Sequence, residues 1–412
     1  MTRPMPPGAA PVNTAVGSAV GRGAPGRVAE VHAQTRRGLL VAAGLVAAVV
    51  AGVVRVGAGW WLPLHLFVVG GLLSAISATT KMFAVTWSAA PSLRPVVVGA
   101  QRWALAAGAV ALVVGRETDQ TWMFVAGGAT VILAMLALAM ILLRVRRQAV
   151  TDRFAPAIEA YVAAVVAGAV GMSLGVVLGT GRAGDRAVEL RGAHLVLNVL
   201  GLIGLVIAGT LPYFAATQVR SKMSPRATPT AMRVTFLALA AATAVAATGE
   251  ILDRPGVIAA GLVTYVFGLL LIAAMLPIDA RVRLRWAGPC VVQLLTGIAW
   301  WAAMTVALAL AAVRGSEDRA ILQALVIGGF AQILIASLAY LGPVLRGGGH
   351  QRLTAGFAIT RSWVSLAAGN TAALAALAGH GPTLAAALAV WVTDVVVRAA
   401  RLLAKPRSIA NV

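Results

Sequence analysis

Long apolar runs, separated by short polar and mostly basic segments, make up most of this chain. A helix needs about 20 apolar residues to cross a hydrocarbon core about 30 Å thick, since each residue advances it by about 1.5 Å. Such runs lie at residues 38–57, 62–87, 96–115, 120–143, 155–179, 193–217, 231–249, 256–277, 287–312, 320–345, 361–379 and 383–404. Unpaired backbone groups are too costly in hydrocarbon, and the runs lack the alternation of barrel strands. The pattern therefore predicts an all-α integral membrane protein with about 12 transmembrane helices.

Composition supports lipid as the main surrounding of the chain. Hydrophobic residues make up 60% of it and charged residues only 11%, whereas a soluble domain is about 25% charged. The net charge of +21 does not indicate a nucleic-acid partner, because the arginines lie between apolar runs and not on one face. We expect residues 1–37 to form a disordered basic cytoplasmic tail, residues 38–404 the membrane domain, and residues 405–412 a short cytoplasmic tail.

The charge of the loops alternates along the chain and predicts its orientation. One set is basic: Arg94 and Arg102; Arg144, Arg146, Arg147 and Arg153; Arg220, Lys222, Arg226 and Arg233; Arg281, Arg283 and Arg285. The other set is mixed or acidic, with Glu117, Asp119, Asp185, Glu189, Glu250, Asp253, Glu317 and Asp318. Basic loops stay on the cytoplasmic side, so both termini are predicted to be cytoplasmic, in a bacterial plasma membrane. An even number of spans agrees with this.

Landmarks recur along the chain at intervals of about 130 residues. His65, His194 and Gln323 begin the second, sixth and tenth spans, 129 residues apart. The arginines at the start of the third, seventh and eleventh spans, Arg102, Arg233 and Arg361, are 131 and 128 residues apart. We therefore predict three pseudo-equivalent four-helix repeats, at about 38–147, 155–285 and 287–407, related by an axis along the membrane normal.

This plan resembles that of haem–copper oxidase subunit I and its distant NnrS-type relatives. The segment from His194 to Leu205, with Gly209-Thr210-Leu211-Pro212 after it, is also similar to membrane regions of actinobacterial proteins, some fused to copper-oxidase domains. The resemblance implies that His65 occupies the place of a haem-ligating histidine near the outer end of span two. It also implies haem or copper as the cofactor, and a separate redox or cupredoxin protein as a partner.

The sequence departs from the oxidases where their chemistry resides. Span ten, which supplies histidines to both haems in that family, has Gln323 and no histidine. His194 stands alone in span six, so the family's copper site is incomplete. We therefore expect a degenerate metal site and no oxidase activity.

Each candidate residue has a plainer alternative. His65 and His194 would be metal or haem ligands, or else interfacial residues that cap helices. Glu159 and Asp394 would line a polar pathway, or else form ion pairs with nearby arginines. The three recurring arginines would contact an anionic group, or else extend to the interface and fix the topology. Lys81, about 24 Å beyond His65 along the span, is expected to reach the inner interface.

Three functions agree with the sequence. The leading hypothesis is a redox-associated or haem- or copper-handling membrane protein that is not an enzyme. The first alternative is a secondary transporter or channel, because helical repeats and acids within spans are typical of that class. The second is a structural partner of a separate redox protein.

Reporter fusions test the predicted topology. Fusions after Arg147, Arg226 and Arg285 should report cytoplasm, and fusions near Glu117, Glu189 and Asp318 should report the outside. A cytoplasmic signal at Glu189 would contradict the twelve-span arrangement.

Overall fold

The computed structural model describes residues 24–56, 61–277, 287–316, 319–347 and 349–404, and every regular element in these ranges is helical. The first third contains α1 (Ala24–Val56), α2 (Trp61–His65), η1 (Leu66–Leu72), α3 (Leu73–Trp87), α4 (Pro95–Glu117) and α5 (Thr121–Arg147). The middle contains η2 (Asp152–Phe154), α6 (Ala155–Gly179), η3 (Gly184–Arg186), α7 (Ala187–Val196), η4 (Leu197–Gly204), α8 (Leu205–Gln218), α9 (Pro229–Ile251) and α10 (Pro255–Ala274). The last third contains α12 (Pro289–Arg314), α13 (Arg319–Ala324), η5 (Leu325–Ala331), α14 (Gln332–Arg346), α15 (Gly349–Thr360), α16 (Trp363–Leu377) and α17 (Gly381–Leu403).

The predicted helical membrane architecture is confirmed. Within the described residues, ten helices are long and apolar enough to cross a membrane, and each apolar run expected to span contains a helix. The two remaining expected spans correspond to α16 and α1. Helix α16 has only 15 residues, and α1 ends in residues whose side chains lie outside the described part of the chain. The chain is therefore a polytopic helical membrane protein.

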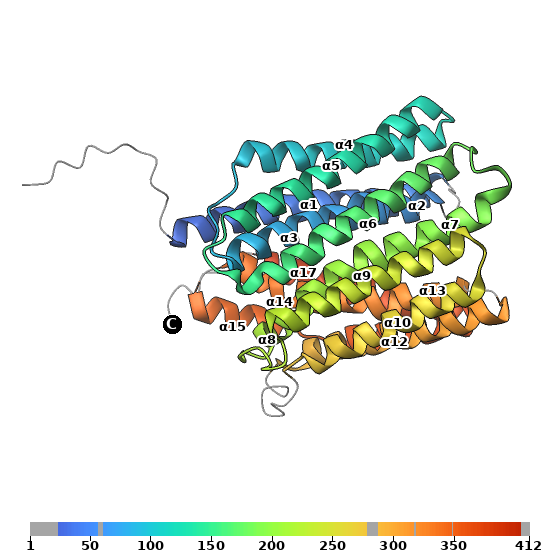
Figure 1. Cartoon of the computed structure of the whole chain (residues 1–412). Helices are drawn as coiled ribbons and strands as arrows, with labels where there is room; N and C mark the ends of the chain where they lie inside the picture. Colours follow the sequence, from blue (N-terminus) through green and yellow to red (C-terminus); the bar gives the residue numbers. More distant parts are fainter. Residues whose placement is uncertain (1–23, 57–60, 278–286, 317–318, 348, 405–412) are drawn as a thin grey trace, which may run out of the picture.

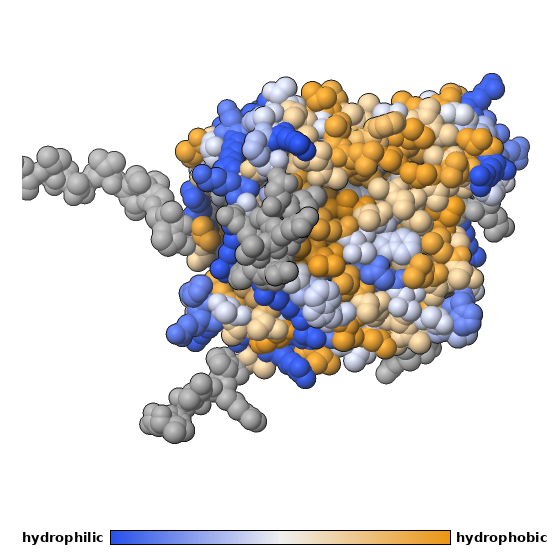
Figure 2. Space-filling view, turned by 90° about the horizontal axis from the view of Figure 1, so that it is seen from below, coloured by the Kyte–Doolittle hydropathy of each residue, from blue (hydrophilic) through white to orange (hydrophobic). Residues whose placement is uncertain are grey.

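Lipid-facing side chains form an apolar band around the bundle. Leu133, Met140, Leu237 and Phe267 are large apolar residues that are more than half exposed in the isolated chain. Figure 2 shows hydrophobic atoms over the middle of the molecule, with hydrophilic atoms gathered toward its ends. Exposed apolar surface of this extent needs hydrocarbon around it.

The same packing pattern occurs three times along the bundle. The first long helix of each third packs on the helix that contains a π segment: α1 on η1 and α3, α6 on η4 and α8, and α12 on η5 and α14. The third and fourth long helices then form a hairpin: α4 with α5, α9 with α10, and α16 with α17. A contact between α1 and α14 brings the first and last thirds together.

Three π-helical segments interrupt the second, sixth and tenth spans at matching places. They are η1, η4 and η5, which begin within three residues after His65, His194 and Gln323. π-Helix is rare, and its wider turn changes which backbone carbonyls are paired. The buried hydroxyl of Tyr265, on α10, donates a hydrogen bond of 2.9 Å to the backbone carbonyl of Leu200 in η4. A side chain of a neighbouring helix thus forms a hydrogen bond with a backbone carbonyl of the widened turn.

The helices run between two ends of the molecule, and these ends differ in charge. The helices α2, α7 and α13 lie at one end, at the right in Figure 1. The start of α1 and the end of α17 lie at the opposite end, together with the loops of Arg147 and Arg226 that were expected to be basic. The last of the four basic loops, with Arg281, Arg283 and Arg285, lies outside the described residues, as do Glu317 and Asp318 of an outer loop.

Two segments differ from the sequence-based expectation. Residues 24–37 were assigned to the disordered tail, but they form the first part of α1. Val31 and Thr35 are buried there against the bundle, so packing orders a segment whose composition suggested disorder. Helix α15 was also not expected, and Thr360 at its end donates a hydrogen bond of 2.6 Å to the carbonyl of Ala339.

Small residues allow the two helices of a hairpin to pack closely, and a substitution at Gly261 tests this. A Cβ at Gly261 in α10 would lie 2.5 Å from the backbone nitrogen of Ala246 and 2.8 Å from the carbonyl oxygen of Ala242, both in α9. We expect Gly261→Ala to force the helices apart and cost about 1–3 kcal/mol, measured as a lower unfolding midpoint in detergent. Gly256→Ala, on the same helix with no atom within 4 Å of its Cβ, is the control and should leave the midpoint unchanged. Equal midpoints for the two variants would contradict this packing.

Candidate functional site

His65 lies at the end of α2, and its ring is held from two sides. Its Nδ1 lies 2.8 Å from the carbonyl oxygen of Trp61, one helical turn earlier. Its ring also stacks on the Trp61 indole, with the centroids 4.1 Å apart, and the Arg116 guanidinium lies 5.9 Å from that indole. Since a carbonyl only accepts, Nδ1 must carry the proton, which leaves Nε2 as the free nitrogen of a neutral imidazole.

His194 is held in the same way on α7. Its Nδ1 lies 2.7 Å from the carbonyl oxygen of Gly171 on α6, and the amide of Asn198 lies 3.3 Å from the same nitrogen. The ring packs directly on Gly175, where a Cβ would lie only 2.7 Å from it. The tautomer is therefore that of His65, with Nε2 free.

The two histidines lie at the same end of the molecule, on different spans. His65 and His194 are close enough for the charge of one to act on the other. The Phe124 ring on α5 is 6.3 Å from the Trp61 ring and packs in one cluster with Trp61 and Val176. Neither Nε2 has a partner among the described side chains.

This arrangement offers two nitrogen ligands and no complete metal set. Among the described residues, no group of three or more His, Cys, Asp or Glu side chains is placed to hold a metal ion. Metal-binding histidines commonly donate their other ring nitrogen to a carbonyl, as both histidines do here. The pair thus matches the chemistry of a partial site.

A haem between spans two and ten does not fit the residues present. Gln323 in α13 stands where the oxidase family has histidine, and glutamine is a poor haem ligand. Between spans six and ten, beside η4 and η5, the interior is filled by rings. Trp301 is fully buried there and packs against Tyr265 and Phe330, with centroids 6.0 and 5.3 Å away.

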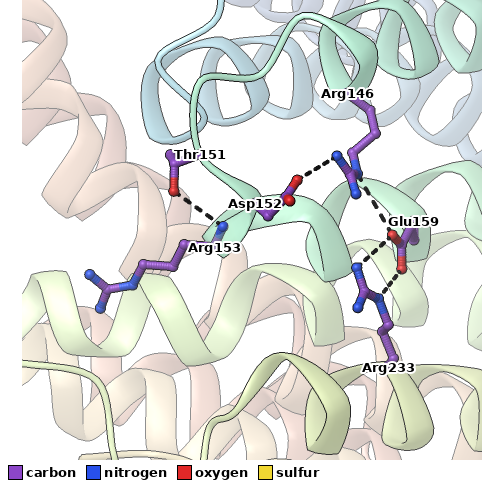
Figure 3. A network of polar contacts seen from close by, with 6 residues as sticks. All are labelled: Arg146, Thr151, Asp152, Arg153, Glu159 and Arg233. Atoms are coloured by element: carbon purple, nitrogen blue, oxygen red, sulfur yellow. Dashed lines mark hydrogen bonds and ion pairs between the residues drawn. The ribbon is translucent and has the colours of Figure 1, made fainter.

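Glu159 lies in a cluster of ion pairs at the opposite end of the bundle (Figure 3). Its carboxylate accepts two hydrogen bonds from Arg233, of 2.8 and 3.1 Å, and lies 3.7 Å from Arg146. Arg146 also pairs with Asp152 at 2.8 Å, so the cluster joins α5, α6 and α9. The Glu159 side chain is 43% exposed, and an exposed pair of this kind contributes about 0–1 kcal/mol. These contacts are those of the ion-pair alternative, with Arg233 and Arg146 as the partners of Glu159.

Asp394 is paired one helical turn away, on α17. Its Oδ1 accepts a hydrogen bond of 2.8 Å from Arg398, whose guanidinium also donates to the carbonyls of Ile359 and Arg361. Arg398 thereby caps the end of α15 and holds it against α17. The second carboxylate oxygen, Oδ2, is buried without a protein partner among the described residues.

The recurring arginines have different surroundings. Arg233 binds Glu159, and Arg361 lies beside Gly288 at the start of α12. Arg102 stacks over the Trp103 indole at 5.6 Å, while its Nε is buried and unpaired in the described structure.

Lys81 was expected at the interface, and this prediction is wrong. The residue is only 6% exposed, and its ammonium bonds to Ser77 and Gln101 inside the bundle. Distance along a helix gives the depth of a residue, but not the direction of its side chain. The sequence held one signal, since Ser77 lies one turn before Lys81 on the same helix face.

The chain was compared with known proteins. No family model matches it, and no curated protein is similar to it. The resemblance to the haem–copper oxidases therefore remains an expectation that rests on topology and short motifs.

Proposed function

We propose that the chain is a plasma-membrane protein of three four-helix units, with the haem–copper-oxidase plan and both termini in the cytoplasm. Three features support the repeat: the recurring packing of first and second helices, the hairpins of third and fourth helices, and a π segment at matching places in spans two, six and ten. Rare features recurring at one interval favour descent from one unit over coincidence. The cytoplasmic termini follow from the basic loops at the end of the molecule where α1 begins.

We further propose that this protein handles copper at its outer face and is not an oxidase. The proposal rests on one observation: His65 and His194 have the same tautomer, because the Nδ1 atom of each is hydrogen-bonded to a backbone carbonyl and its Nε2 is left free. Imidazole nitrogen suits copper, whereas a haem would need the histidine that Gln323 replaces. When bound, copper supplies one-electron chemistry, and the two histidines hold and orient it. A separate redox or cupredoxin protein at this face would complete the ligand set.

A second function, secondary transport, is favoured by a different observation. Lys81 is an ionisable group buried within a span, and it has no carboxylate partner among the described residues. Such groups are costly in a membrane and mark ion or substrate pathways. Uptake by the protein in liposomes would distinguish this function from copper handling.

Substitution of His65 tests the copper proposal. We expect the purified protein to bind about one copper ion per chain, measured by elemental analysis, without a haem absorption band. His65→Ala and His194→Ala should each lower copper affinity by about 10–100-fold. Helical content should be unchanged, because each imidazole is only partly buried and lies near one end of its span.

The exposed His380, which caps α17, provides a matched control. His380→Ala should bind copper as the wild type does. Copper binding that is absent from the wild type, or equal in all three variants, would contradict the proposal.

A further inference from the structure

Lys81 is held by a hydrogen-bond network that joins three helices. Its ammonium donates to the Ser77 hydroxyl at 3.0 Å and to the Gln101 Oε1 at 2.6 Å. Ser77 donates to the same Oε1 at 2.9 Å. These residues are at most 6% exposed, so water does not screen the charge.

The network is arranged to receive a protonated lysine. Gln101 Nε2 donates to the backbone carbonyl of Ala134 on α5 at 3.0 Å, which fixes the amide with its oxygen toward Lys81. The lysine therefore meets two oxygen acceptors. No hydrogen-bond donor is directed at the Lys81 nitrogen within the described residues, so the site accommodates the ammonium. An ammonium has three N–H groups, and the third has no protein partner among these residues.

The charges around Lys81 leave it without compensation. The positive charge of Arg102 repels that of Lys81, and the positive charge of Arg37 repels that of Arg102. No ion pair to Lys81 or Arg102 is formed within the described residues. A buried charge is costly unless it is paired, so this cluster needs a negative partner.

A small pocket lies between the two cations. It is lined by α1, α3 and α4, with Lys81, Arg102, Ser74, Ser77, Gln34 and Thr35 as its polar side chains, and no acidic residue lines it. Two of its polar atoms, Ser74 Oγ and Arg102 Nε, are buried without a protein partner. Thr79 and Thr80, further along α3, bond instead to the carbonyls of Ala75 and Ile76. The Ser74 hydroxyl and the guanidinium are therefore unused donors at one pocket.

We propose that this pocket binds one small monovalent anion, held by Lys81, Arg102 and the Ser74 hydroxyl. The pocket volume of about 20 Å³ is room for about one water-sized particle, which admits a halide such as chloride. Lys81 lies on the same span as His65 but about 24 Å further along it, so the pocket is separate from the two histidines. The proposal rests neither on copper handling nor on transport.

Anion binding to the full-length protein in detergent tests the assignment. We expect radiolabelled chloride to bind saturably at about one ion per chain, and chloride, but not gluconate at equal ionic strength, to raise the unfolding midpoint. Lys81→Met should weaken binding at least tenfold, and Ser74→Ala should weaken it less. Lys222→Met removes an exposed lysine and should bind as the wild type does.

A second measurement needs no variant, in case Lys81→Met does not fold. Crystals of the wild-type protein grown in bromide should give an anomalous peak between Lys81 and Arg102. Water alone at that position, equal stabilisation by chloride and gluconate, or unchanged binding in Lys81→Met would overturn the proposal.

Discussion

The cost of leaving a polar group unpaired in hydrocarbon is the constraint on which this structure depends. It requires helices wherever the backbone crosses lipid, and it also governs the exceptions. Where the backbone widens into π-helix in η4, the Tyr265 hydroxyl reaches the carbonyl of Leu200. Where α15 ends against α17, Arg398 pairs the carbonyls of Ile359 and Arg361. Side chains thus supply hydrogen bonds to backbone carbonyls where the regular helix no longer does.

The same constraint separates structural charges from functional candidates. The carboxylate of Glu159 meets Arg233 and Arg146 at the end of the bundle, and that cluster is explained by its own contacts. Lys81 is buried, and its hydrogen-bond partners are neutral. The two histidines are neutral groups with one nitrogen held and one free. The copper proposal rests on the free Nε2 atoms of the histidines, and the anion proposal on Lys81 with the unpartnered Ser74 hydroxyl and Arg102 Nε beside it.

Sequence periodicity predicted the helices well because hydrophobicity and length decide them. The expected run 155–179 coincides with α6, and most other runs differ from their helices by a few residues, whereas α1 begins 14 residues before the first run. The π segments were not predicted, because no residue type specifies a π turn. The direction of Lys81 and the partners of Glu159 depend on which helices are neighbours, which a single sequence does not contain. The spacing of His65 and His194 predicted that they lie at one end of the molecule, but it did not predict the hydrogen bonds to Trp61 and Gly171 that set their tautomers.

X-ray absorption at the copper edge of the copper-loaded protein tests the central functional claim most directly. The account predicts nitrogen scattering with the outer-shell pattern of imidazole, together with an optical spectrum that lacks a haem band. That pattern should be lost when both His65 and His194 are replaced. A copper site without imidazole, or a protein purified with bound haem, would contradict it.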